Sequence, residues 1–175
     1  MNSRLNLKEY VRDIKDFPLQ GILFRDITTV LKDPIALRSA IDAMAECVKA
    51  LEFDAILGPE SRGFIFGVPM AYNMGKGFVP VRKAGKLPAE VAQKEYALEY
   101  GTATIEIHRD AIKQGQRFII VDDLLATGGT ANAVCGLVKE LGGEVIAQVY
   151  FIELVGLGGR DKLTGHDIRT VLEYK

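Results

Sequence analysis

Residues 118–130 read FIIVDDLLATGGT, and the rest of the sequence is most easily interpreted from them. The first four residues are apolar without a break, which is typical of a central parallel strand that is covered on both faces. Two acids follow, then a turn of small residues and glycines, and then a helix predicted from Thr130 to Leu141 and ended by Gly142-Gly143. A buried strand that leads through such a turn into a helix indicates an α/β protein.

The segments on either side continue the alternation of strands and helices. Apolar runs predict strands at 53–57, 78–81, 145–152 and 168–172, and alternation of apolar and polar residues predicts a half-exposed antiparallel strand at 103–107. Helices are predicted at about 6–15, from Asp33-Pro34 onward and at 62–72. We therefore expect a mostly parallel sheet flanked by helices, in a single domain covering residues 1–175.

One stretch, from Lys83 to Gly101, fits neither a helical nor a strand period. Irregular segments of this length are uncommon in compact domains and are usually lids or binding loops. A surface insertion or a poorly patterned helix are the alternatives.

Two turns in the sequence are suited to binding an anion. In the turn after Asp123, glycines allow backbone amides to approach closely, the following helix contributes its N-terminus, and Thr127 and Thr130 add hydroxyls. The turn contains no lysine, which favours a phosphate monoester over a nucleoside triphosphate. The segment 58–64, GPESRGF, also follows a strand and opens a helix, and its arginine offers a charged fork for a diphosphate.

The paired acids Asp122 and Asp123 are not expected to hold a phosphate, because like charges repel. They could accept hydrogen bonds from a ribose diol, bind a cation, or favour positive charge on a sugar ring. A helix cap beside a solvated acid would account for one of them but not for both.

Composition excludes several other functions. The formal net charge of −1 gives no general attraction to nucleic acid or to an anionic membrane. The two cysteines, Cys47 and Cys135, are far apart and are expected as buried free thiols, with a disulfide as the alternative, and the two histidines make a histidine metal site improbable. The sequence has neither a signal-peptide pattern nor an apolar run that could span a bilayer, so we expect a soluble, cytoplasmic protein.

Residues 121–130, VDDLLATGGT, resemble the PRPP-binding motif of type I phosphoribosyltransferases. The resemblance implies a Rossmann-like sheet with a small N-terminal hood, formed mainly by residues 1–33. It implies that Asp122 and Asp123 engage the ribose hydroxyls of PRPP. The residues implied in holding the 5′-phosphate are Ala126, Thr127, Gly128, Gly129 and Thr130.

Further segments are similar to those of the adenine phosphoribosyltransferases. SRGF at 61–64 resembles their pyrophosphate loop, which implies a non-proline cis peptide between Glu60 and Ser61. RKAGKLP at 82–88 resembles the start of their flexible catalytic loop, here about 83–101, which ends in a pair matching Glu99 and Tyr100; the glutamate would exchange a proton with the base. The implied pyrophosphate-binding residues are Glu60, Ser61, Arg62, Arg82, Lys83 and Lys86, and some contacts would cross a dimer interface.

The base-recognition segment of that family is matched by residues 17–34. The resemblance implies that the Leu23 carbonyl accepts a hydrogen bond from the exocyclic amine of adenine and that the Arg25 amide donates to a ring nitrogen. Phe24 would pack on one face of the purine, although core packing is an equal alternative for Phe24 taken alone, and Leu154 would lie on the other side.

The implied reaction is adenine and PRPP to AMP and pyrophosphate, in purine salvage, through an oxocarbenium-like transition state. Mg²⁺ would be held by substrate and water with no direct protein ligand, and the enzyme would be a homodimer that binds neither nucleic acid nor membrane. One rival is a phosphoribosyltransferase for hypoxanthine, guanine or xanthine, whose 6-oxygen the Leu23 carbonyl would repel. Another is a PRPP-sensing regulator that binds RNA or DNA, which should show a basic face and could dispense with Glu99.

Overall fold

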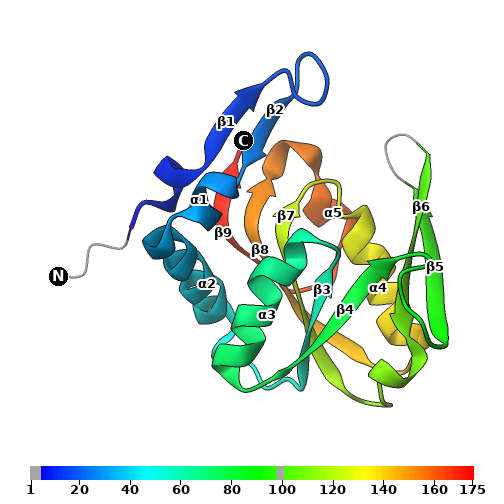
Figure 1. The fold of residues 1–175 in the computed structure, drawn as a ribbon. Helices are drawn as coiled ribbons and strands as arrows, with labels where there is room; N and C mark the ends of the chain where they lie inside the picture. Colours follow the sequence, from blue (N-terminus) through cyan, green and yellow to red (C-terminus); the bar gives the residue numbers. More distant parts are fainter. Residues whose placement is uncertain (1–4, 98–100) are drawn as a thin grey trace. The chain divides into compact units, whose positions relative to one another are not determined.

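The computed structural model describes residues 5–97 and 101–175, which fall into two compact units divided between Ala43 and Met44 (Figure 1). None of the helices in these residues has the length and apolar character needed to cross a membrane.

The N-terminal unit is built around a two-stranded antiparallel sheet. A 3-10 turn, η1 (Leu7–Tyr10), leads into β1 (Arg12–Lys15), which pairs with β2 (Leu23–Asp26), and α1 (Thr28–Lys32) follows. The helix predicted at 6–15 is therefore wrong beyond residue 10. The apolar residues do recur at helical spacing, but charged residues of β1 lie opposite charged residues of β2: Arg12 forms an ion pair with Asp26, and Asp13 with Arg25. These cross-strand pairs favour the strand.

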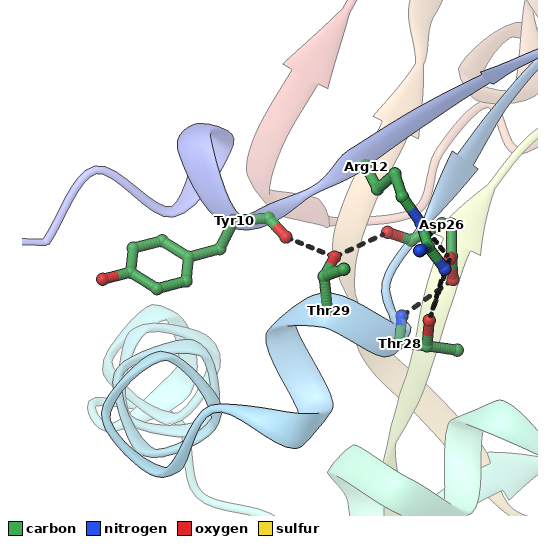
Figure 2. Close-up of polar contacts among 5 residues, drawn as sticks. All are labelled: Tyr10, Arg12, Asp26, Thr28 and Thr29. Atoms are coloured by element: carbon green, nitrogen blue, oxygen red, sulfur yellow. Dashed lines mark hydrogen bonds and ion pairs between the residues drawn. The ribbon is translucent and has the colours of Figure 1, made fainter.

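A buried acid at the end of β2 connects this strand to β1 and to α1 by hydrogen bonds. Asp26 is 6% exposed and accepts hydrogen bonds from the Arg12 Nε (3.0 Å), from the Thr28 amide (2.9 Å) and from the Thr28 hydroxyl (2.8 Å), as Figure 2 shows. The Thr29 hydroxyl donates to the Tyr10 carbonyl and so joins α1 to η1. Burial alone would raise the pKa of Asp26, but the Thr28 and Arg12 donors together hold it below its ordinary value.

Helix α2 (Pro34–Val48) begins where the sequence predicts. One carboxylate oxygen of Asp33 accepts hydrogen bonds from the amides of Ile35 and Ala36, both at 2.9 Å, and Pro34 occupies the first helical position. This is the arrangement that a capping aspartate followed by proline favours.

The second unit contains a seven-stranded sheet in the order β5-β6-β4-β3-β7-β8-β9. Five neighbouring strands run parallel: β4 (Gly77–Lys83), β3 (Ala55–Pro59), β7 (Arg117–Leu125), β8 (Glu144–Leu154) and β9 (Ile168–Tyr174). The strand predicted at 103–107 is β6 (Thr102–His108), and it is antiparallel to β4 as expected. The predicted fold class, a mostly parallel sheet flanked by helices, is confirmed.

Helices α3 (Arg62–Met74) and α4 (Gly129–Glu140) cover opposite faces of the sheet. The side chain of Ile56 meets α3 beside Gly67, whereas the next residue, Leu57, lies in a buried cluster with Val134 and Leu137 of α4. Neighbouring side chains of a strand point to opposite faces, so the two helices do as well. The remaining elements are short: η2 (Arg109–Ala111), η3 (Val155–Leu157) and α5 (Gly159–Lys162).

The expectation of irregular structure throughout 83–101 is wrong for its middle part, because residues Val91–Ala97 form the regular strand β5. Strand β5 pairs along its whole length with β6 as an antiparallel hairpin at one edge of the sheet (Figure 1). Only Ala92 is buried in β5, and most of its other side chains are exposed, as is common for edge strands. The apolar alternation that reveals a strand is therefore weak here.

Candidate active site

The turn between β7 and α4 is held in shape by glycine. Gly128 has a φ of +77°, and a Cβ at this position would lie 2.7 Å from the carbonyl oxygen of Gly159. A Cβ at Gly159 would in turn lie 2.3 Å from the carbonyl oxygen of Ala126. The turn and the start of α5 therefore pack backbone against backbone, which requires glycine at both positions.

The turn forms one wall of a pocket of about 110 Å³ at the carboxyl ends of the strands. All five residues expected to hold a phosphate line this pocket: Ala126, Thr127, Gly128, Gly129 and Thr130. Asp122, Tyr96 and Tyr150 are among the other residues that line it. Because α4 begins at Gly129, the free amides and the positive end of the helix dipole lie at this pocket, as binding of an anion requires.

A second pocket of about 400 Å³ adjoins the first. It is lined by Glu60, Ser61, Arg62, Arg82 and Lys83, five of the six residues expected to contact a diphosphate. Both pockets include Pro59, Tyr96, Asp122, Leu124, Ala126 and Thr130. A ligand with an anionic group at each end could therefore occupy both pockets, with its centre beside Asp122.

Each arginine in the larger pocket is paired with an acid. The Arg62 Nε lies 2.6 Å from Asp123 Oδ2, and the Arg82 Nε lies 2.8 Å from Glu60 Oε2. Glu60 also accepts the amide of Lys83 at 3.1 Å. The hydrogen bond from Arg82, followed by that of the Lys83 amide, lowers the pKa of Glu60, so this carboxylate stays ionised and holds the Arg82 guanidinium in place.

The Glu60–Ser61 peptide is cis, which confirms the expectation for this segment. Gly63, in the first turn of α3, lies very close to the end of β7: a Cβ there would be 2.9 Å from the Val121 carbonyl oxygen and 3.1 Å from Asp122 Oδ1. The glycine of the SRGF segment therefore allows the two turns that are expected to bind anions to meet at the acid pair.

The acid pair itself is electrostatically strained. Asp123 is 6% exposed, and its amide donates to Asp122 Oδ1 at 2.9 Å. Asp122 is half-buried and lines both pockets. Burial, and then the neighbouring charge of Asp123, raises the pKa of Asp122 well above its ordinary value. Burial also raises the pKa of Asp123, against the opposing effect of Arg62. The pair is therefore suited to receive hydroxyl donors or positive charge.

Seven further residues were expected at the site. Lys86 is exposed and Leu154 half-buried, and neither lines the two pockets. Leu23, Phe24 and Arg25 form most of β2 in the N-terminal unit. Glu99 and Tyr100 lie outside the described residues.

Sequence reasoning missed several side chains at the site, among them Tyr96, and it missed Glu106, which lies opposite Arg82 in the sheet. Tyr96 of β5 lines both pockets, and its hydroxyl oxygen accepts a hydrogen bond from the Thr130 hydroxyl at 3.2 Å. Glu106 of β6 is 1% exposed and binds the backbone that follows Arg82 and Lys83. Tyr96 is the only aromatic residue of β5, which is a weak signal of a role at the site. Nothing in the sequence distinguishes Glu106 from a solvated strand residue.

The shape of the turn that is expected to hold a phosphate can be tested with two glycine variants. Gly115 has a φ of +78° and no atom within 4 Å of a Cβ, so Gly115→Ala reports the backbone strain alone, about 1–2 kcal/mol. Gly128→Ala adds the clash with Gly159. We expect Gly128→Ala to weaken binding of ribose 5-phosphate by about tenfold or more, the equivalent of about 1.4 kcal/mol, in calorimetry. Gly115→Ala should leave that affinity unchanged, and equal affinities in both variants would contradict this account of the turn.

Comparison with known proteins agrees with the geometry. The model of the phosphoribosyl transferase domain family matches residues 26–167. The adenine phosphoribosyltransferase of Lachnoclostridium phytofermentans is 60% identical over 168 residues, which cover 96% of this chain and 97% of the relative. The crystal structure of the Thermoanaerobacter pseudethanolicus adenine phosphoribosyltransferase superposes with a TM-score of 0.93 at 53% identity, covering 96% of this chain and 98% of the other.

A more distant match is the adenine phosphoribosyltransferase of Saccharomyces cerevisiae, solved in complex with adenine and an imino-altritol bisphosphate. It has a TM-score of 0.88 and 41% identity, with 94% of this chain and 96% of the yeast chain covered. The family model spans most of the chain, and the identities extend over nearly its full length. This chain therefore belongs to the adenine phosphoribosyltransferase family, within the phosphoribosyl transferase domain proteins.

Proposed function

We propose that this chain transfers the 5-phosphoribosyl group of PRPP to adenine, forming AMP and pyrophosphate in purine salvage. One observation carries the proposal: two adjoining pockets, one at a helix N-terminus and one lined by cations, share the wall that contains Asp122. PRPP has a phosphate at one end and a diphosphate at the other, with a ribose between them. The family membership and the adenine bound to the yeast relative support the same assignment.

The smaller pocket would bind the 5′-phosphate of PRPP. Amides at the start of α4 and the hydroxyls of Thr127 and Thr130 are its donors, and Ala126, Gly128 and Gly129 leave room for the phosphate oxygens. Tyr96 would close the side formed by β5.

The larger pocket would bind the diphosphate. Arg62, Arg82 and Lys83 supply positive charge, and Ser61 supplies a hydroxyl. Glu60 would act indirectly, because it holds Arg82, whose guanidinium also lies 5.9 Å from the ring of Phe64. Lys86 would join this set of cations.

The acid pair would hold the ribose between the two anionic ends. Asp122 and Asp123 would accept hydrogen bonds from its hydroxyls and stabilise the positive charge that develops on the sugar as the diphosphate leaves. Two acids that are costly to ionise in the free protein gain most from such partners. Because Arg62 already contacts Asp123, a diphosphate bound by Arg62 would lie next to the reacting carbon.

Mg²⁺ would be held at this site by the substrate and water, with no direct protein ligand. In residues 5–97 and 101–175, no three His, Cys, Asp or Glu side chains gather as a metal site. The carboxylates that line the pockets are Glu60, Asp122 and Asp123, and two of them are paired with arginine. Mg²⁺ dehydrates reluctantly and commonly binds substrate phosphates while it keeps several waters, which suits this assignment. When bound, the ion would offset negative charge on the departing diphosphate.

The base would be recognised by β2 and by Glu99. The Arg25 side chain forms an ion pair with Asp13, which leaves the backbone of β2 as the natural contact for adenine. We assign the Leu23 carbonyl to the exocyclic amine, the Arg25 amide to a ring nitrogen, and Phe24 and Leu154 to the faces of the purine. Glu99, with Tyr100 beside it, would take a proton from N7 or N9 of adenine as the new bond forms.

The enzyme would work as a homodimer in the cytoplasm. Helix α3 presents Ile65, Val68 and Tyr72 to solvent, with Tyr72 86% exposed, and these apolar residues recur at helical spacing. Sedimentation equilibrium should give a dimer. Cys135 is a buried free thiol, which suits a reducing compartment, and Cys47 is half-buried.

The direct test is AMP formation by the purified chain from adenine and PRPP. We expect turnover with adenine and Mg²⁺, and little turnover with hypoxanthine or guanine or after chelation of the metal. Faster turnover with an oxypurine would assign the chain to another base. Absence of turnover with any base, together with retention of RNA or DNA in a gel-shift assay, would favour a regulator.

A further inference from the structure

Glu106 is an acid that the proposed reaction does not use. It lies on β6, is 1% exposed, and forms no ion pair with any Lys or Arg of the described chain. A buried carboxylate without a cation is costly unless several hydrogen bonds replace its water. Glu106 therefore needs a structural or functional explanation.

Four donors converge on this carboxylate. Oε1 accepts the amides of Lys86 (2.8 Å) and Leu87 (2.7 Å), while Oε2 accepts the amide of Gly85 (3.0 Å) and the side-chain amide of Gln93 (3.1 Å). Three consecutive backbone amides that point at one anion form a nest, which binds a charged acceptor better than a neutral one. Burial acts to raise the pKa of Glu106, but these donors outweigh it and lower the pKa.

The turn held in this way continues directly from the cations of the larger pocket. Arg82 lies opposite Glu106 in the β4–β6 pairing, and Lys83 opposite Ile105. The Ala84 amide then donates to the Thr104 carbonyl at 3.1 Å, and residues 85–87 bind Glu106. The carboxylate thus fixes the path of the chain immediately after Arg82 and Lys83, and it fixes the backbone of Lys86.

The fourth donor connects the same carboxylate to the hairpin strand. Gln93 belongs to β5, and three residues further along β5 is Tyr96, which lines both pockets. A single buried charge therefore joins β6, the turn after β4, and the strand that borders the smaller pocket.

We propose that Glu106 is a positioning residue for the diphosphate of PRPP. Its ionised carboxylate holds the 85–87 turn, and through it the cationic segment Arg82–Lys86, in the geometry that binds the diphosphate. The proposal rests on the proposed function, because it takes that segment to be the diphosphate site.

The variant Glu106→Gln tests this role. Glutamine keeps the size of the side chain, but it replaces one acceptor oxygen by an amino group, which cannot accept from the amides that point at it. We expect the KM for PRPP and the dissociation constant for Mg²⁺-pyrophosphate to rise about 10–100-fold, the range for losing a charge-assisted interaction. The kcat and the affinity for ribose 5-phosphate should change less than about threefold.

Two companion variants keep the test decisive. Glu95→Gln removes an exposed acid from β5 and should leave every constant unchanged. Gln93→Ala removes only one of the four donors, so the fold should be kept, and pyrophosphate should bind about two- to fivefold more weakly. If Glu106→Gln does not fold, the proposal is tested by Gln93→Ala, in which pyrophosphate should bind more weakly while the fold is kept.

A purely structural role predicts a different pattern. In that case Glu106→Gln would lower the melting temperature and weaken ribose 5-phosphate and pyrophosphate alike, which would overturn the proposal. Unchanged pyrophosphate affinity in both Glu106→Gln and Gln93→Ala would also overturn it, while AMP formation by the wild-type chain would leave the proposed function standing. A wild-type chain that forms no AMP would overturn both.

Discussion

Replacing both Asp122 and Asp123 by asparagine is expected to lower kcat/KM for PRPP by about 10²–10⁴-fold. Each carboxylate would lose a charge-assisted hydrogen bond to a ribose hydroxyl, worth about 1.5–3 kcal/mol. The amides that replace them would also fail to stabilise positive charge on the sugar. Initial rates of AMP formation at about pH 8 measure the effect. A loss of less than about tenfold would contradict the role proposed for the acid pair in holding the ribose.

The same double variant should be more stable than the wild type. A loss of activity in this variant therefore could not be attributed to unfolding. The pKa of each acid is raised in the folded protein, mainly by burial, so folding disfavours the ionised form. The wild type therefore loses stability as the pH rises from the ordinary carboxyl pKa through the raised one, and asparagine does not. Thermal unfolding should show the variant more stable at about pH 8, with a difference that shrinks toward about pH 4. A less stable variant at the higher pH would contradict this reading.

The second large effect is expected for Glu99→Gln. Glutamine is the same size but cannot take a proton from adenine, and general acid–base help is typically worth about 10²–10⁴-fold in rate. Turnover should fall by that factor, while PRPP should bind with nearly wild-type affinity in calorimetry. Glu95→Gln, four residues earlier, is the matched control and should keep full turnover. Equal turnover in Glu99→Gln and wild type would refute the assignment of the proton-transfer role.

This second prediction rests on the resemblance of the Glu99-Tyr100 pair, since both residues lie outside the described part of the chain. The first rests on geometry as well, because Asp122 lines both pockets and Asp123 lines the larger one.

The sequence predicted the elements that bear strong local signals. The unbroken apolar run at 118–121 lies in the first half of β7, and Asp33-Pro34 lies at the start of α2. The turn rich in glycine and the SRGF segment were recognisable because close backbone approach limits each of them to a few residue types. Residues of that kind can be read from a single chain.

Elements that depend on distant partners were not predicted correctly. Residues 12–15 have a helical spacing, but pairing with β2 makes them a strand. Strand β5 lacks a clear alternation because it lies at an edge. The sequence pattern around Glu106 is that of a surface residue, but in the folded protein the amides of residues 85–87 donate to its carboxylate. In each case the deciding contact is made by residues at least five positions away, and most of them are much further, which local patterns do not record.

The pairing of Arg62 with Asp123 and of Arg82 with Glu60 was also beyond the sequence. Both arginines were expected to serve the diphosphate, and nothing in the chain order indicates which acid each one meets. In the folded protein these acids hold the guanidinium groups at the pocket. The cations are therefore positioned before any ligand arrives, which lowers the entropic cost of binding.

Calorimetric titration of the purified chain with ribose 5-phosphate and with Mg²⁺-pyrophosphate, separately and together, tests the two-pocket arrangement most directly. We predict that each ligand binds alone, that the chain saturated with one still binds the other, and that PRPP with Mg²⁺ displaces both at one molecule per chain. Mutually exclusive binding of ribose 5-phosphate and pyrophosphate, or no detectable binding of PRPP, would contradict the arrangement.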